Sequence, residues 1–179
     1  KMERIAADGL VCICERENNF SILEVNSETD FVAKNIEFIN FVEEITKLAL
    51  VNFGIMKKIL TSKMKNNINV GNNLISLISK IGEKITIRRS DFIESDKFIN
   101  FSYTHLPVKN NLGKIGVLLS LETNKKKNEI LEFGKHLSMH IAATAPLAID
   151  VSGLDKNIIK KEKKIITEEL KNSGKDSKI

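Results

Sequence analysis

Apolar residues follow two different periods near the start of the chain, one typical of strands and one typical of a helix. Residues 10–14 and 20–25 are short, mainly apolar runs that flank the polar pair Asn18-Asn19, which predicts an antiparallel hairpin. From about residue 36 to residue 52, apolar side chains recur at i, i+3, i+4 and i+7, which predicts a helix. Its predicted inward face comprises Phe38, Phe41, Val42, Ile45, Leu48 and Ala49.

The same order of strands and helices recurs farther along the chain. A second long helical pattern occurs at residues 124–143, and its predicted inward face contains Ile130, Phe133, Leu137 and Ile141. The predicted elements after residue 52 are helices at 57–66 and 74–81 separated by a loop at 66–73, a strand at 83–89, strands at 98–105 and 114–121 separated by a loop at 107–113, the helix at 124–143, a short strand at 147–150 and a helix at 154–170.

This repeated order predicts an α+β fold with two similar halves. Each half is expected to be a small antiparallel sheet (strand-strand-helices-strand) backed by helices, and a C-terminal helix follows. The expected boundaries are residues 1–95 for the N-terminal half, 96–153 for the C-terminal half and 154–179 for the C-terminal helix and tail.

The junction between the second strand and the long helix contains several residues suited to a helix start. Ser27 and Thr29 can each accept a hydrogen bond from the first N–H groups of a helix, and Asp30 suits its positive end. The cap does not account for Phe31, which precedes the apolar stripe of the helix. The Phe31 ring either packs into the core of its own domain or is displayed as an anchor for a partner.

The stretch from Glu24 to Asn35, and above all its part from Thr29 onward, resembles the signature of the elongation factor Ts family. Four further stretches agree with the family in the same order. They lie at residues 6–10, 80–89, 113–119 and 139–143, the last followed by Pro146. The resemblance implies a core, or dimerisation, domain that lacks the family's N-terminal helical domain and C-terminal module, and that therefore binds more weakly than the full-length factor.

The resemblance implies that the protein is a guanine nucleotide exchange factor for elongation factor Tu. In the family, the residues that match Asp30 and Phe31 are inserted near the magnesium and phosphate site of that GTPase. Further positions implied to contact the partner are Thr29, Val32, Ile81, Gly82 and His105. The resemblance implies no enzyme activity, no cofactor and no direct nucleotide binding, and it leaves open whether two copies form a homodimer.

Charge suggests an alternative function. The chain has a formal net charge of +5, and residues 155–179 contribute +3 of it, with eight lysines against five acids. A basic protein associated with RNA or the ribosome, without exchange activity, would use this Lys-rich tail. A charge run of this kind is more often a solvated helix face.

Other candidate chemistry is sparse. Cys12 and Cys14 lie two residues apart on a predicted strand, and we expect both to be reduced and buried. His136 and His140 have a spacing that can hold zinc, but Leu137 occupies the place where a metalloprotease helix carries its glutamate. No apolar run approaches the ~20 residues of a membrane span. The resemblance implies an intracellular protein of a bacterial cytoplasm, a mitochondrial matrix or a plastid stroma.

Overall fold

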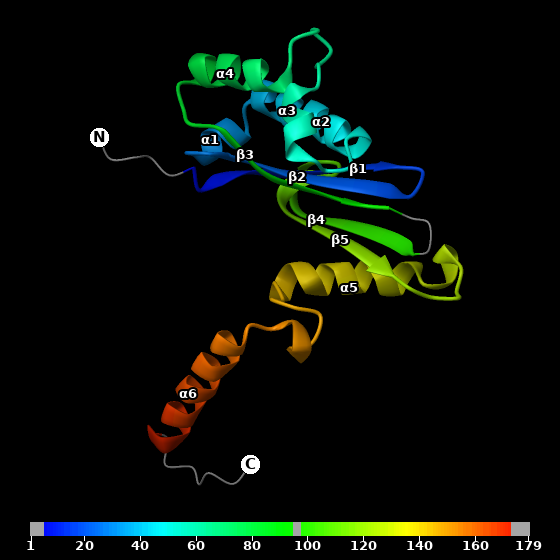
Figure 1. Cartoon of the computed structure of the whole chain (residues 1–179), viewed down its shortest axis with the longest axis vertical. Coiled ribbons are helices and arrows are strands. Elements are labelled where there is room, and N and C mark those ends of the chain that lie inside the picture. Colours follow the sequence, from blue (N-terminus) through cyan, green and yellow to red (C-terminus); the bar gives the residue numbers. More distant parts are fainter. Residues whose placement is uncertain (1–5, 95–97, 173–179) are drawn as a thin grey trace. The chain divides into compact units, whose positions relative to one another are not determined.

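All five strands belong to one antiparallel sheet with the order β3-β2-β1-β5-β4 (Figure 1). This is a computed structural model, and it describes residues 6–94 and 98–172. The strands are β1 (Asp8–Arg16), β2 (Asn19–Ser27), β3 (Thr86–Ile93), β4 (Ile99–Lys109) and β5 (Leu112–Leu121). The α+β class is confirmed, but the two predicted strand groups join, because β1 pairs with β5 at Val11↔Gly113 and Cys12↔Leu112.

Two compact units divide the chain, Lys1–Ala143 and Thr144–Ile179. The boundary at 95/96 that the sequence predicts between two halves lies outside the described residues, as do residues 1–5 and the last part of the predicted tail, 173–179. Within the described ranges, no helix is both long and apolar enough to cross a bilayer.

The first hairpin turns one residue earlier than predicted. Glu17 and Asn18 both have positive φ, 52° and 64°, as the two central residues of a primed hairpin turn require. Asn19 therefore already belongs to β2, and it lies opposite Arg16. The loop predicted at 107–113 is likewise shorter, because β4 continues to Lys109 and the chain turns at residues 110–111.

Of the six α-helices in the described residues, four lie on one face of the β3-β2-β1 part of the sheet (Figure 1). These are α1 (Asp30–Ala33), α2 (Ile36–Val51), α3 (Met56–Thr61) and α4 (Val70–Ile81). Asparagines begin the two longest of them: Asn35 Oδ1 accepts from the Glu37 N–H at 2.8 Å, and Asn69 Oδ1 accepts from the Asn72 N–H at 2.8 Å. The Asn69 cap starts α4 earlier than predicted, so residues 70–73 are helical.

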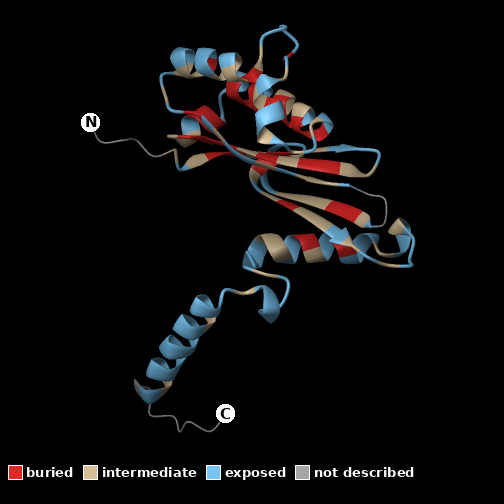
Figure 2. Ribbon diagram, viewed as in Figure 1, coloured by how far each residue is buried: buried red, intermediate tan, exposed pale blue. Residues whose placement is uncertain are grey.

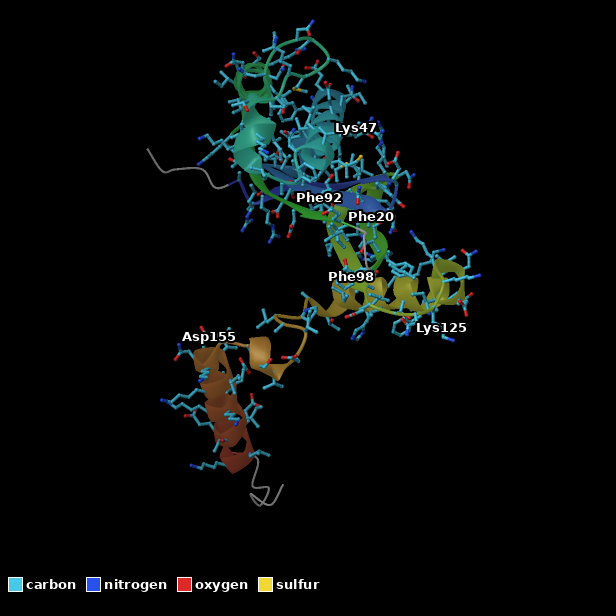
Figure 3. The ribbon with its side chains drawn as sticks, turned by 45° about the vertical axis from the view of Figure 1, so that its right-hand side comes forward. Phe20, Lys47, Phe92, Phe98, Lys125 and Asp155 are labelled. Carbon is cyan, nitrogen blue, oxygen red and sulfur yellow. The ribbon has the colours of Figure 1, made fainter. Side chains whose placement is uncertain are left out.

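The core lies between these helices and the sheet. The predicted inward face of α2 is confirmed, since five of its six residues are buried and Leu48 packs against them partly buried. Figure 2 shows the buried residues gathered on α2 and on the central strands. Phe20 and Phe92, both labelled in Figure 3, lie on the neighbouring strands β2 and β3, one register position apart.

The helix α5 (Leu131–Thr144) packs closely on β4. A Cβ atom added at Gly134 would lie 2.5 Å from the Phe101 ring, so this glycine allows the close approach. The buried face is therefore centred on Gly134 and Ser138, and the prediction that Phe133 points inward is wrong. The helix also begins later than predicted, after a 3₁₀ turn at Lys127–Glu129.

In the second unit, the strand predicted at 147–150 does not form. Leu147 and Ile149 are fully or mostly exposed, and Asp150 instead caps a 3₁₀ turn, Val151–Gly153, by accepting from the Ser152 N–H at 2.8 Å. The predicted C-terminal helix is confirmed as α6 (Lys156–Asn172), which is exposed along almost its whole length (Figure 2).

Candidate functional site

One aromatic ring projects from the short helix α1. Phe31 is 75% exposed, although the next two residues, Val32 and Ala33, are 4% and 1% exposed and belong to the core. The helix turn is therefore fixed from inside while the ring points into solvent. Of the two alternatives that the sequence leaves open, the structure has the displayed ring. Val32, predicted as a contact residue, instead anchors the turn from within the core.

A charged pair stands beside the ring. Lys34 Nζ lies 2.7 Å from Asp30 Oδ2 and 5.7 Å from the centre of the Phe31 ring. The hydrogen bond from Lys34 to Asp30, together with the negative charge of Asp30, raises the pKa of Lys34. Both side chains are about half exposed or more, so the carboxylate can be reached by a partner.

The predicted capping role of Ser27 and Thr29 is wrong. Ser27 Oγ donates to the Thr29 carbonyl at 2.9 Å, and no side chain of α1 caps its first turn. Thr29 turns instead toward a residue far along the chain. Its Oγ1 donates to Glu83 Oε1 at 2.7 Å, and its backbone N–H donates to Glu83 Oε2 at 3.0 Å.

This contact brings two predicted segments together. Ile81 ends α4 and packs partly buried against the core, and Gly82 follows in the left-handed conformation with φ 80°. Glycine adopts this conformation without strain. The turn at Gly82 places Glu83 beside Thr29. Six of the seven predicted contact residues thus lie in two segments, 29–32 and 81–82, that the hydrogen bonds of the adjoining Glu83 bring together.

His105 lies elsewhere, on β4 opposite Ile115. Its ring is exposed, and the Tyr103 hydroxyl lies 3.0 Å from its Nδ1. Within the described part of the chain, no hydrogen bond or ion pair joins His105 to α1 or to Glu83. The neighbouring Leu106 has a positive φ of 48° and is exposed, so the strand is irregular at this point. His105 therefore lies on the edge strand β4 and is not hydrogen-bonded to the α1 segment.

Sequence reasoning missed Glu83 and, next to Thr29, Glu28. The Glu28 carboxylate accepts from the backbone N–H of Lys84 at 2.8 Å. The pairs Thr29–Glu83 and Glu28–Lys84 are each more than 50 positions apart in the sequence. Hydrophobic periodicity carries no information on such distant pairs. The available signal was limited to a glycine that ends a helix and is followed by an acid.

Several charged side chains on the sheet form ion pairs within the protein. Arg88 and Arg89 both contact the Glu24 carboxylate, at 3.4 and 2.5 Å. Lys114 donates to Asp8, and this bond, with a second one from the Gly9 N–H, lowers the pKa of Asp8. Arg89 and Lys114 line a cavity of about 430 Å³ on the sheet.

The two cysteines are free thiols, and burial raises the pKa of Cys12 to about 11. Cys14 is only partly buried, although the sequence predicts that it is buried. His136 and His140 are both exposed on α5. In the ranges that the structure covers, no three His, Cys, Asp or Glu side chains are grouped as metal ligands.

Comparison with known proteins identifies the family. The family model described as Elongation factor TS matches residues 28–179. The whole chain is 39% identical over 180 residues to an elongation factor Ts of Methylorubrum populi, and 35% identical over 182 residues to that of Maricaulis maris. It spans 58% of the length of each of these relatives. The chain therefore belongs to the elongation factor Ts family.

Proposed function

We propose that this chain is the core of a guanine nucleotide exchange factor that accelerates GDP release from elongation factor Tu. One observation carries the proposal: within the family signature, the Phe31 ring is 75% exposed on a turn whose next two residues are buried. A large ring held in a fixed direction is the kind of group that anchors a protein interface. The ring enters the partner near its magnesium and phosphate site.

Energetics limit what the ring can do alone. Because coupling between two ligands is reciprocal, a factor that weakens GDP binding is itself weakened by GDP to the same extent. An acceleration of about 10³-fold requires ~4 kcal/mol of contacts that form only as GDP leaves. Burying one phenylalanine side chain contributes about 1.5–3 kcal/mol. The rest has to come from other contacts.

Asp30 is the first of these additional contacts. Its carboxylate forms an exposed pair with Lys34 in the free chain. Exposed pairs of this kind contribute little to stability. Asp30 can therefore exchange Lys34 for a hydrogen-bond donor of the partner at small cost. Ile81 and Gly82 add contacts next to the α1 turn, and His105 contributes from β4. The proposed role is one of binding, with no covalent step and no cofactor.

The proposal is tested by the release of fluorescently labelled GDP from elongation factor Tu in a stopped-flow instrument. At saturating chain we expect release to accelerate by at least about tenfold, which corresponds to ~1.4 kcal/mol. The same release rate with and without the chain would contradict the proposal.

The rival function rests on α6, a helix with six lysines against three glutamates, nearly all of them exposed. Affinity for RNA should fall steeply with salt, because phosphate contacts release counterions. A complex anchored by an apolar ring should depend on salt much less. Titrations of elongation factor Tu and of a single-stranded RNA at about 50 and 200 mM salt separate the two functions.

A further inference from the structure

Two carboxylates tie the segment that carries Phe31 to the segment that follows α4. Glu83 accepts both the backbone N–H and the hydroxyl of Thr29, at 3.0 and 2.7 Å. In return Glu28 accepts the backbone N–H of Lys84 at 2.8 Å. These three hydrogen bonds join Glu28 and Thr29 to Glu83 and Lys84. Neighbouring residues on each segment thus bind neighbouring residues on the other.

The helix α1 depends on help from outside itself. It has four residues, about one turn, and isolated helices this short are unstable in water. In a capping box, a Glu at the third helical position accepts the N–H of the N-cap residue. In α1 the N-cap residue is Thr29 and the third position is Val32. The Val32 side chain is buried in the core and has no atom that can accept a hydrogen bond. Glu83 supplies the missing carboxylate from a distant segment.

The backbone of Glu83 is itself well placed for this task. On one side Gly82 ends α4, with its N–H donating to the Ile78 carbonyl at 2.8 Å. On the other side Ile85 is buried in the core at 3% exposure. Glu83 is therefore held between a helix end and a core residue, and its carboxylate is presented to Thr29 from a fixed base.

We propose that Glu83 is a positioning residue for Phe31, and that it acts on nucleotide exchange through the α1 turn. This inference rests on the proposed function. Without the Glu83 carboxylate, the first turn of α1 opens, and the ring stays exposed but loses its fixed direction. An anchor that is displaced by even about 1 Å can lose much of its effect on a rate.

The direct test is a double-mutant cycle with Glu83→Ala and Phe31→Ala, read out as the rate of labelled GDP release from elongation factor Tu. If Glu83 acts through Phe31, then Glu83→Ala slows release by about fivefold or more in the wild-type background and has almost no effect in the Phe31→Ala background. An equal loss in both backgrounds would mean that Glu83 contacts the partner itself. An unchanged rate in folded Glu83→Ala would remove its role altogether. Both results overturn the inference.

Glu44→Ala is the matched control. The Glu44 carboxylate accepts the backbone N–H of Lys65 at 2.5 Å, so its loss removes the same kind of bond from another part of the same unit. We expect its release rate to equal that of the wild type. If Glu83→Ala fails to fold, Thr29→Val replaces it in the cycle. Valine keeps the size of threonine and the backbone N–H bond to Glu83, but its side chain cannot donate, so one of the two bonds is lost. A smaller loss with the same dependence on Phe31 is expected.

A second readout is independent of the partner. The N–H groups of Lys34 and Asn35 donate to the carbonyls of Phe31 and Val32, at 3.1 and 2.9 Å, and so report on the α1 turn. Glu83→Ala should speed amide hydrogen exchange at these two positions by about tenfold while core amides of α2 remain protected. Unchanged amide protection at Lys34 and Asn35 would overturn the inference, even if the chain accelerates GDP release. Faster amide exchange in a chain that does not accelerate GDP release would contradict the proposed function instead.

Discussion

Two exposed phenylalanines, Phe31 and Phe133, project from segments that differ in how firmly they are packed. Phe31 is 75% exposed, but its turn is held by buried neighbours and by the hydrogen bonds of Glu83. Phe133 is 59% exposed on α5, whose buried residues are the small Gly134 and Ser138. The exposure of a ring therefore does not by itself identify it as an anchor for a partner protein. The ring has to project from a segment that is fixed independently of it.

The packing of the two regions accounts for this difference. The main core cluster consists of side chains between Leu10 and Ile85, and Leu112 alone joins it from the later strands. Segments with few buried apolar contacts open at lower free energy than core segments. The α1 turn therefore shares the stability of the core, whereas α5 is expected to be the less stable element.

The largest expected effect is a difference in unfolding free energy between two Phe→Ala variants. Phe38 is fully buried in α2, and Phe38→Ala should destabilise the chain by about 3–5 kcal/mol. Phe133→Ala should cost less than about 1 kcal/mol, because its ring is mostly in solvent. Urea denaturation measures both. Equal losses would mean that α5 is as well packed as α2, and the comparison would fail.

A smaller effect is expected at the contact between α5 and β4. Gly134→Ala would bring a methyl group to within 2.5 Å of the Phe101 ring and should cost about 1–3 kcal/mol by overpacking. Gly71→Ala in α4 is the control. Its nearest neighbour would lie at 3.6 Å, so we expect stabilisation of up to about 1 kcal/mol. Thermal unfolding of both variants should shift in opposite directions.

The smallest effect concerns the ion pair between the strands β1 and β5, which joins Asp8 to Lys114. The bond lowers the folded-state pKa of Asp8 below its ordinary value. The stabilisation is therefore complete above the unfolded pKa and is lost as the pH falls through the folded value. Since both groups are partly exposed, we expect a deficit of only about 0.5 kcal/mol in Asp8→Asn at pH 7.

This small deficit should close as the pH falls through the lowered pKa of Asp8, where the carboxyl becomes protonated in the folded wild type as well. Denaturation midpoints of the two proteins between neutral pH and pH 2 would show the convergence. A deficit that persists at the acid end would show that the side chain of Asp8 stabilises the fold by packing rather than by charge.

Local patterns in the sequence predicted those parts of the fold that local physics determines. The inward face of α2, the hairpin of β1 and β2 and the helix α6 follow from periodicity and from turn residues. The joining of β1 to β5 could not be predicted this way, because it depends on two register pairs about 100 residues apart. The prediction of a strand at 147–150 is wrong for a related reason. A short, mainly apolar segment forms a strand only where a partner strand is available.

The candidate site shows the same division. The signature marked Phe31, but its local pattern could not distinguish a core ring from a displayed one. That orientation depends on Val32 and Ala33 filling the core and on Glu83 binding Thr29 across more than 50 residues. His105, which the resemblance also implies as a contact residue, lies on the edge strand β4, and its contact with the partner stays a prediction.

The most direct test of the displayed ring compares Phe31→Ala with Phe133→Ala in the release of labelled GDP from elongation factor Tu. We predict that Phe31→Ala slows release by at least about tenfold, a loss of ~1.4 kcal/mol of interaction in the release step. Its unfolding free energy should stay close to that of the wild type, because an exposed ring contributes little to folding. Phe133→Ala should release GDP as the wild type does. A folded Phe31→Ala variant that releases GDP at the wild-type rate would contradict the account.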